Sequence, residues 1–164
     1  LAILLKNSKV KHASLIMKRQ KIKINDFKPE HLNQVKDILY ENFEYPWSDS
    51  HILSENSFSI KKVVLSADRI IGFFAGEIIF SEGSITMIAL KKEFQRKGIG
   101  TYLLDWFVNL SKEKGVKNIW LEVSSKNKKA IRFYENYGFI IEDIRPSYYK
   151  DGSDALIMRY PVYP

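Results

Sequence analysis

The chain of 164 residues contains no cysteine. It can therefore form no disulfide, no thiolate metal site and no cysteine acyl intermediate. No apolar run approaches the ~20 residues that a membrane-spanning helix needs, and the apolar start, residues 1–5, is shorter than the ~7–15 residues of a signal-peptide core. The three histidines, His12, His31 and His51, are scattered without metal-ligand spacing. We therefore expect a cytoplasmic protein that binds no membrane and no metal.

Acidic residues are missing from one end of the chain. Residues 1–25 hold seven Lys or Arg and no Asp or Glu, whereas residues 26–164 hold nineteen of each sign. The net charge of +7 thus comes entirely from the N-terminal segment. A neutral body argues against a nucleic-acid-binding face, although the basic tail can still touch RNA or the ribosome weakly. The first Met is Met17, so either the chain starts at a non-AUG codon or the natural start is Met17.

Length and periodicity predict one domain with no repeat and no linker. We assign residues 1–20 to a basic N-terminal extension and residues 21–164 to the domain. Alternation predicts strands over 21–24, 62–66, 70–80, 83–90, 118–123, 139–144 and 155–159. Helical spacing of apolar residues predicts helices over 30–42, 50–56, 99–114 and 128–137. The order β-α-α-β-β-β-α-β-α-β-β is that of a mixed α/β fold.

A basic, glycine-containing turn opens the third of these helices, and it comprises Gln95, Arg96, Lys97, Gly98, Ile99, Gly100 and Thr101. The first N–H groups of a helix have no intrahelical partner, and the helix dipole favours negative charge there. Glycines let the backbone approach a phosphate closely, and the two basic side chains can add charge-assisted contacts. The turn therefore predicts a pyrophosphate site.

Two common phosphate motifs do not fit this turn. A P-loop would place a lysine before a final Ser or Thr, but Gly100 is followed directly by Thr101. A dinucleotide fingerprint would place a third glycine near Leu103, where none occurs. What remains is the pattern Gln/Arg-x-x-Gly-x-Gly/Ala. The alternative is a glycine-rich strand-to-helix turn on a basic surface, with no ligand.

Further motifs in the same order along the chain carry a family resemblance. They are Phe43-x-Tyr45-Pro46-Trp47, Leu121-Glu122-Val123, Asn127, Ala130-Ile131-x-Phe133-Tyr134, Gly138-Phe139 and Arg145-Pro146-x-Tyr148-Tyr149. Together with the turn they resemble the GCN5-related N-acetyltransferase (GNAT) superfamily over roughly residues 21–160. Within it, they resemble the protein Nα-acetyltransferase branch, which includes ribosomal-protein-alanine acetyltransferases and the arrest-defective catalytic subunit of NatA. The resemblance implies a GNAT fold, with a mixed, mostly antiparallel sheet of about six to seven strands and about four helices.

The resemblance also implies an activity, a co-substrate and partners. The enzyme would transfer the acetyl group of acetyl-CoA to the free α-amine of protein N-termini, by direct attack in a ternary complex. Its partners would be protein or peptide N-termini, including ribosomal or nascent chains. The turn at 95–101 would bind the pyrophosphate, the strand Ile88, Ala89 and Leu90 would pair with the pantetheine arm, and Asn127 would contact that arm. Asn127 can equally serve as N-cap for the helix that follows it.

Glu122 is the candidate general base. It follows the apolar run 119–121 and precedes Val123, and a carboxylate in a largely buried strand is costly unless it is used or paired. Desolvation raises the pKa of a carboxylate and makes it a better base. By resemblance Glu122 matches the carboxylate that acts as base, often through water, in the ribosomal-protein enzymes. The alternative is a strand glutamate that faces solvent or pairs with a nearby lysine.

Tyr134 is the candidate general acid. By resemblance it lies near the sulfur of CoA, and a phenol with a pKa of ~10 can protonate a leaving thiolate whose pKa is ~8.5. Its spacing along the helix with Ala130, Ile131 and Tyr137 also fits a core aromatic.

Two aromatic loops are the candidate walls of a slot for the substrate peptide. By resemblance, Tyr148 and Tyr149 form one wall, and Phe43, Tyr45, Pro46 and Trp47 form the other. A narrow slot would admit a free chain end, whose α-amine has a pKa of ~7.7–8.0 against ~10.4 for lysine. The alternative is that these are ordinary loop aromatics packed on the core.

The chain departs from the ribosomal-protein pattern at two positions. Ser124 stands where those enzymes usually have an Arg, and Lys126 replaces the small residue before the Asn. These departures leave a broader range of N-terminal substrates open. Two other interpretations also remain: an acetyltransferase for small amines such as polyamines or antibiotics, and a non-catalytic acyl-CoA-binding or ribosome-tethered module.

Overall fold

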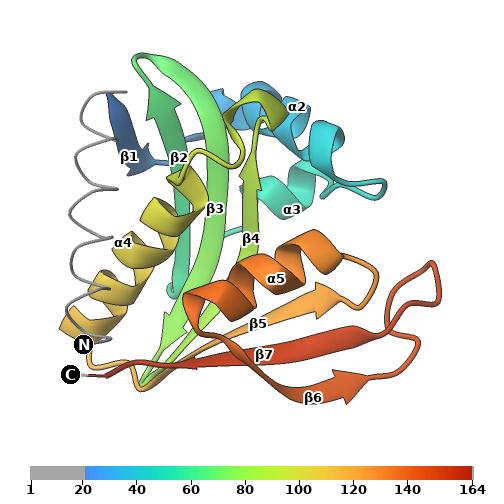
Figure 1. Ribbon diagram of the computed structural model, residues 1–164. Helices are drawn as coiled ribbons and strands as arrows, with labels where there is room; N and C mark the ends of the chain where they lie inside the picture. Colours follow the sequence, from blue (N-terminus) through green and yellow to red (C-terminus); the bar gives the residue numbers. More distant parts are fainter. Residues whose placement is uncertain (1–20, 164) are drawn as a thin grey trace. The chain divides into compact units, whose positions relative to one another are not determined.

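The computed structural model describes residues 21–163, so the predicted basic extension over 1–20 lies outside the described residues. Within that range seven strands and four α-helices follow one another (Figure 1) in the predicted order. The elements are β1 Ile22–Asp26, η1 Pro29–His31, α2 Leu32–Asn42, α3 Asp49–Leu53, β2 Ser59–Ser66, β3 Arg69–Ile79, β4 Glu82–Leu90, η2 Lys92–Phe94, α4 Ile99–Glu113, β5 Asn118–Ser124, α5 Lys128–Tyr137, β6 Ile140–Arg145 and β7 Ala155–Pro161. The predicted mixed α/β class is confirmed.

The strands hydrogen-bond in the order β1-β2-β3-β4-β5-β7-β6. The pairs β1–β2, β5–β7 and β6–β7 are antiparallel, whereas β4 and β5 run parallel. Figure 1 shows β7 between β5 and β6. A shift in register between Ile141 and Asp143 interrupts the β6–β7 pairing. The sheet is therefore mixed and mostly antiparallel, as predicted.

Two compact units make up the described chain. The first unit contains residues 21–75 and Met87–Phe107, and the second unit contains Gly76–Thr86 and residues 108–163. Strands β3 and β4 and helix α4 each contribute residues to both units. None of the helices within residues 21–163 combines the length and the apolar character needed to span a membrane.

The core of the first unit forms around the buried face of α2. Val35, Ile38 and Leu39 are fully buried, as their spacing of three and four residues predicts for one side of a helix. Phe27 contacts the ring of Phe73 edge-on, with 5.6 Å between centroids. The helix predicted over 50–56 is shorter than expected. Its observed form, α3, is capped by the side chain of Ser48 and ends at Leu53.

Helix α4 buries a wide apolar face. Ile99, Leu103, Leu104, Phe107 and Val108 are buried. In the first unit, Phe74 packs against Phe107 and Trp106, with centroid distances of 4.9 and 5.2 Å. Trp106 and Leu110 are only partly buried.

Aromatic rings that follow α5 pack together in the second unit. That helix ends at Gly138, whose φ of +123° is a conformation that side chains rarely adopt. A Cβ there would lie 3.3 Å from the ring of Tyr160, so the position has little room for a larger residue. Phe139 is buried directly after this turn, with its ring 5.4 Å from Tyr160.

Candidate functional site

The turn before α4 presents backbone N–H groups. The chain leaves η2, passes through left-handed conformations at Arg96 (φ +56°) and Gly98 (φ +81°), and enters the helix at Ile99. The first helical hydrogen bond runs from the N–H of Tyr102 to the carbonyl of Gly98. The N–H groups of Ile99, Gly100 and Thr101 precede that bond, and such groups suit an anion.

Side chains of the turn divide between solvent and protein. Arg96 and Lys97 are exposed, and the Lys97 ammonium lies 5.5 Å from the centroid of the Phe94 ring. Gln95 instead points into the protein, where its amide donates to Asn42 Oδ1 at 2.8 Å and to the carbonyl of Leu90 at 3.1 Å. Gln95 therefore supports the turn from within.

Helix α2 supplies two contacts to this region that the sequence did not predict. Asn42 Nδ2 donates to the carbonyl of Leu90 at 2.9 Å, and Glu41 Oε2 accepts from the N–H of Lys92 at 3.1 Å. These partners are about fifty positions apart in the sequence, so no local pattern could have revealed them.

The strand proposed to hold the pantetheine arm is the last part of β4. Hydrogen-bonded pairing of β4 with β5 is registered from Glu82 to Ile85 and at no later β4 residue within the described chain. The carbonyl of Leu90 accepts from both Asn42 and Gln95, so both of its lone pairs are engaged. Of Ile88, Ala89 and Leu90, the last can thus offer an arm only its N–H.

The aromatic segment after α2 is only partly open. Phe43 and Trp47 are partly buried against the core of the first unit, and the Trp47 ring stacks on His51 with 4.4 Å between centroids. Pro46 is also partly buried, whereas Tyr45 is 60% exposed. Core packing, the alternative interpretation, therefore holds for Phe43 and Trp47, and Tyr45 is the most accessible of the four.

Glu122 is not buried, so that part of the prediction was wrong. Side chains alternate along β5, and Leu121 and Val123 point into the core while Glu122 points away from it. Its side chain is one-third exposed and forms an ion pair with Arg145, with 2.5 Å between Glu122 Oε1 and Arg145 Nη1. The alternative, a paired strand glutamate, describes this geometry except that the partner is an arginine.

Asn127 caps α5. Its Oδ1 accepts a hydrogen bond from the N–H of Ala130 at 3.1 Å, which confirms the structural role expected for an asparagine at this position. A contact between Asn127 and a cofactor stays a prediction.

Tyr134 lies among other aromatic rings of the second unit. Its ring is 5.1 Å from Phe133 and 5.4 Å from Phe139, measured between centroids. Burial raises the pKa of Tyr134 above the ordinary phenol value. The phenol therefore keeps its proton at physiological pH, and it gives that proton up less readily than a free tyrosine does.

The tyrosine pair lies beside Glu122. Tyr148 is half-exposed, and its ring meets that of Tyr149 edge-on at 5.3 Å. Burial, followed by the nearby charge of Glu122, raises the pKa of Tyr149. The guanidinium of Arg145 lies 5.6 Å from the Tyr148 ring centroid. Glu122, Arg145, Tyr148 and Tyr149 therefore form one cluster.

The two positions that depart from the ribosomal-protein pattern both contact the loop between β6 and β7, which carries Tyr148 and Tyr149. Ser124 Oγ lies 2.9 Å from Ser153 Oγ, and Lys126 donates to the carbonyl and the carboxylate of Asp151 at 3.2 and 3.1 Å. Asp151 also accepts from the N–H and the hydroxyl of Ser153. Hydrogen bonds from Ser153 and then Lys126 lower the pKa of Asp151 to about 2. These contacts were not predicted from the sequence.

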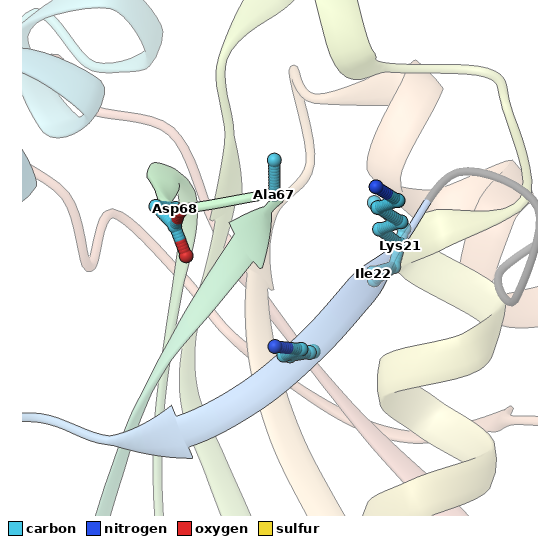
Figure 2. A pocket seen from close by; sticks show the side chains of 5 residues that line it. Lys21, Ile22, Ala67 and Asp68 are labelled. Carbon is cyan, nitrogen blue, oxygen red and sulfur yellow. The ribbon is translucent and has the colours of Figure 1, made fainter.

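Other features add no further candidate. Figure 2 shows a pocket between the start of β1 and the turn that joins β2 to β3, lined by Lys21, Ile22, Lys23, Ala67 and Asp68. It contains none of the candidate residues. Across residues 21–163, no three His, Cys, Asp or Glu side chains are grouped so that they could hold a metal ion.

Comparison with known proteins adds independent information. The profile of the Acetyltransferase (GNAT) family matches residues 25–139. The [ribosomal protein bS18]-alanine N-acetyltransferase of Salmonella typhimurium is 33% identical over 122 residues, which cover 72% of this chain and 82% of that protein.

Two solved structures are also similar. Ard1 from Thermoplasma volcanium superimposes with a TM-score of 0.79 and 32% identity, covering 87% of this chain and 99% of that one. The PaiA N-acetyltransferase from Thermoplasma acidophilum, solved in complex with coenzyme A, gives a TM-score of 0.73 and 25% identity, covering 85% and 98%.

Proposed function

Because the chain belongs to the acetyltransferase (GNAT) family, we propose that it transfers the acetyl group of acetyl-CoA to free α-amines at protein N-termini. The family resemblance drawn from the sequence motifs is confirmed. The observation that carries the finer proposal is the cluster of Glu122, Arg145, Tyr148 and Tyr149 in the second unit. It combines a carboxylate that can take a proton with aromatic rings that can flank an extended peptide.

Acetyl-CoA is the co-substrate, and it supplies an activated acetyl group when bound. The N–H groups of Ile99, Gly100 and Thr101 and the side chains of Arg96 and Lys97 would bind its pyrophosphate. Gly98, in the left-handed conformation with a φ of +81°, directly precedes these N–H groups. Of Ile88, Ala89 and Leu90, the residues whose N–H groups point away from β3 would pair with the pantetheine arm and polarise the thioester carbonyl.

The substrate amine must be neutral before it can attack. An α-amine has a pKa of ~7.7–8.0, so roughly a tenth of it is neutral near pH 7, against well under a thousandth for a lysine. Glu122 would take the amine's proton through a water molecule. Its ion pair leaves the second carboxylate oxygen available, because the 2.5 Å contact with Arg145 uses Oε1.

Tyr134 would hold the proton that the leaving thiolate needs. The raised pKa of its phenol ensures that the proton is present at physiological pH. The same burial makes donation uphill, so we infer that Tyr134 acts as a hydrogen-bond donor that transfers its proton late.

The partners are free protein N-termini, ribosomal proteins included. The relative from Salmonella typhimurium is named for such a substrate, the alanine of ribosomal protein bS18. Ser124 and Lys126 contact the loop that carries Tyr148 and Tyr149, and these contacts support a range of N-termini that can differ from that of the relative.

The decisive experiment uses one peptide that contains an internal lysine, with its N-terminus either free or blocked. We expect acetylation of the free peptide only. Equal rates on both peptides would replace this proposal with a lysine acetyltransferase, and activity on polyamines alone would indicate a small-amine enzyme. Tyr149→Ala should raise the KM for the peptide more than the KM for acetyl-CoA.

A further inference from the structure

We propose that Asn42 is a positioning residue for acetyl-CoA: its side-chain amide holds the pyrophosphate turn in its binding conformation without touching the cofactor. The inference rests on the proposed function only in assigning acetyl-CoA to the turn at residues 95–101. It concerns the first unit alone.

Asn42 lies at the last position of α2, where three parts of the first unit meet. Its Nδ2 donates to the carbonyl of Ile38, at 2.7 Å, and to the carbonyl of Leu90, at 2.9 Å. Its Oδ1 accepts from Gln95 Nε2 at 2.8 Å. One side chain therefore joins the end of a helix, the end of β4 and the first residue of the turn.

These hydrogen bonds form a closed set. Gln95 Nε2 also donates to the carbonyl of Leu90, at 3.1 Å, so the two amides and one carbonyl are mutually bonded. Both N–H groups of each amide and both lone pairs of the carbonyl are in use. All these bonds are partly buried, so loss of either amide leaves its partners without a full set of hydrogen bonds.

The network supports a strained backbone. Arg96 directly follows Gln95 and has a φ of +56°, a left-handed conformation that is unfavourable for a residue with a Cβ. Such a conformation persists only where the surrounding contacts hold it. When Gln95 is held in place, the backbone between β4 and α4 has one conformation, and the N–H groups of residues 99–101 have fixed positions. Without Asn42, the turn can relax and those groups diverge.

A second contact supports the same placement. The carboxylate of Glu41, the neighbour of Asn42, accepts from the N–H of Lys92 at 3.1 Å. The last turn of α2 therefore binds the segment between β4 and α4 at two points, Lys92 and Gln95.

The test is calorimetric titration of the full-length chain with acetyl-CoA. We expect Asn42→Ala and Gln95→Ala each to weaken the Kd by about tenfold, the effect of roughly one lost hydrogen-bonding partner. The Kd of the double variant should lie within about twofold of the Kd of either single variant, because both changes disrupt one network. The matched control is Asn109→Ala, which removes an exposed asparagine from α4.

Kinetics separate positioning from general destabilisation. We expect the KM for acetyl-CoA to rise in parallel with its Kd, while the KM for the peptide changes less than about twofold. A folded Asn42→Ala variant that binds acetyl-CoA as the parent chain does would overturn the inference, as would equal rises in both KM values. If Asn42→Ala fails to fold, Gln95→Ala decides: an unchanged Kd overturns the inference. If the parent chain itself does not bind acetyl-CoA, the proposed function fails instead.

Discussion

The two units hold their candidate residues by different means. In the first unit, neutral amides and carbonyls support the turn, through Asn42, Gln95 and Leu90. In the second unit, ion pairs hold the candidate residues: Arg145 pairs with Glu122, and Lys126 pairs with Asp151. Those four charged side chains are between 33% and 63% exposed.

The difference matters because the two kinds of contact respond to different changes. A neutral, partly buried network depends on the lengths and angles of its hydrogen bonds. A side chain of altered size or shape therefore disrupts it at any salt concentration. Exposed ion pairs are screened by salt and contribute little stability individually. The first unit should therefore be sensitive to changes of size, and the second to changes of charge and pH.

The largest expected effect is a change of size and charge at the turn. Gly100→Glu places a bulky anion in the first turn of α4, where the pyrophosphate is proposed to bind. We expect acetyl-CoA binding to be lost in calorimetry while circular dichroism shows an intact fold. Asn109→Glu, the same new charge on an exposed position of the same helix, should bind acetyl-CoA as the parent chain does. Normal affinity in a folded Gly100→Glu variant would remove the turn from the site.

The next effect concerns charge in the second unit. Glu122→Gln should lower kcat by ~10²–10⁴-fold, the usual range for a lost general base. The defect should shrink as pH rises, because the substrate amine then becomes neutral without help. Measurement of kcat from about pH 6.5 to pH 9.5 checks both statements. A loss that does not vary with pH would mean that Glu122 acts only through its ion pair with Arg145.

A smaller effect is expected at the loop that carries the tyrosines. Asp151→Asn keeps an oxygen for Ser153 but loses the charge that faces Lys126. Urea unfolding at pH 7 should show a lower stability, and Asp151→Ala should be less stable than Asp151→Asn.

The pH dependence of this effect follows from the low pKa of Asp151, about 2 against an ordinary value of 3.8. A carboxyl whose pKa is lower in the folded state stabilises the fold above its unfolded pKa, and that contribution disappears as pH falls through the folded value. The difference between the parent chain and Asp151→Asn should therefore shrink between about pH 4 and pH 2. A constant difference over this range would show that charge is not what holds the loop.

The smallest expected effect is on stability, and it distinguishes two buried serines of the second unit, Ser111 and Ser153. Ser153 is hydrogen-bonded to Ser124 and Asp151, whereas Ser111 Oγ is fully buried with no partner among the described residues. Burying an unpaired hydroxyl is unfavourable, so Ser111→Ala should be neutral or stabilising by on the order of 1 kcal/mol or less in urea unfolding. Ser153→Ala should destabilise. Clear destabilisation by Ser111→Ala would mean that its hydroxyl has a partner after all.

Local sequence rules determined the elements of this fold and the local backbone geometry at two of the candidate positions. The glycine-containing turn before Ile99 and the cap at Asn127 were read correctly because each depends on residues within one helical turn. The order of the strands and helices followed from periodicity in the same way. The family followed from motifs that are short and ordered along the chain.

Tertiary structure alone decided how the candidate residues are supported. Asn42 and Gln95 are 53 positions apart, and Glu122 and Arg145 are 23 apart. Glu122 was expected to be buried because its neighbours are apolar, but the alternation of the strand turned it toward Arg145. Helix and strand patterns specify which face of an element is apolar; they do not specify which distant polar group meets the other face. That choice depends on strand register and helix packing, which form only when the whole chain folds.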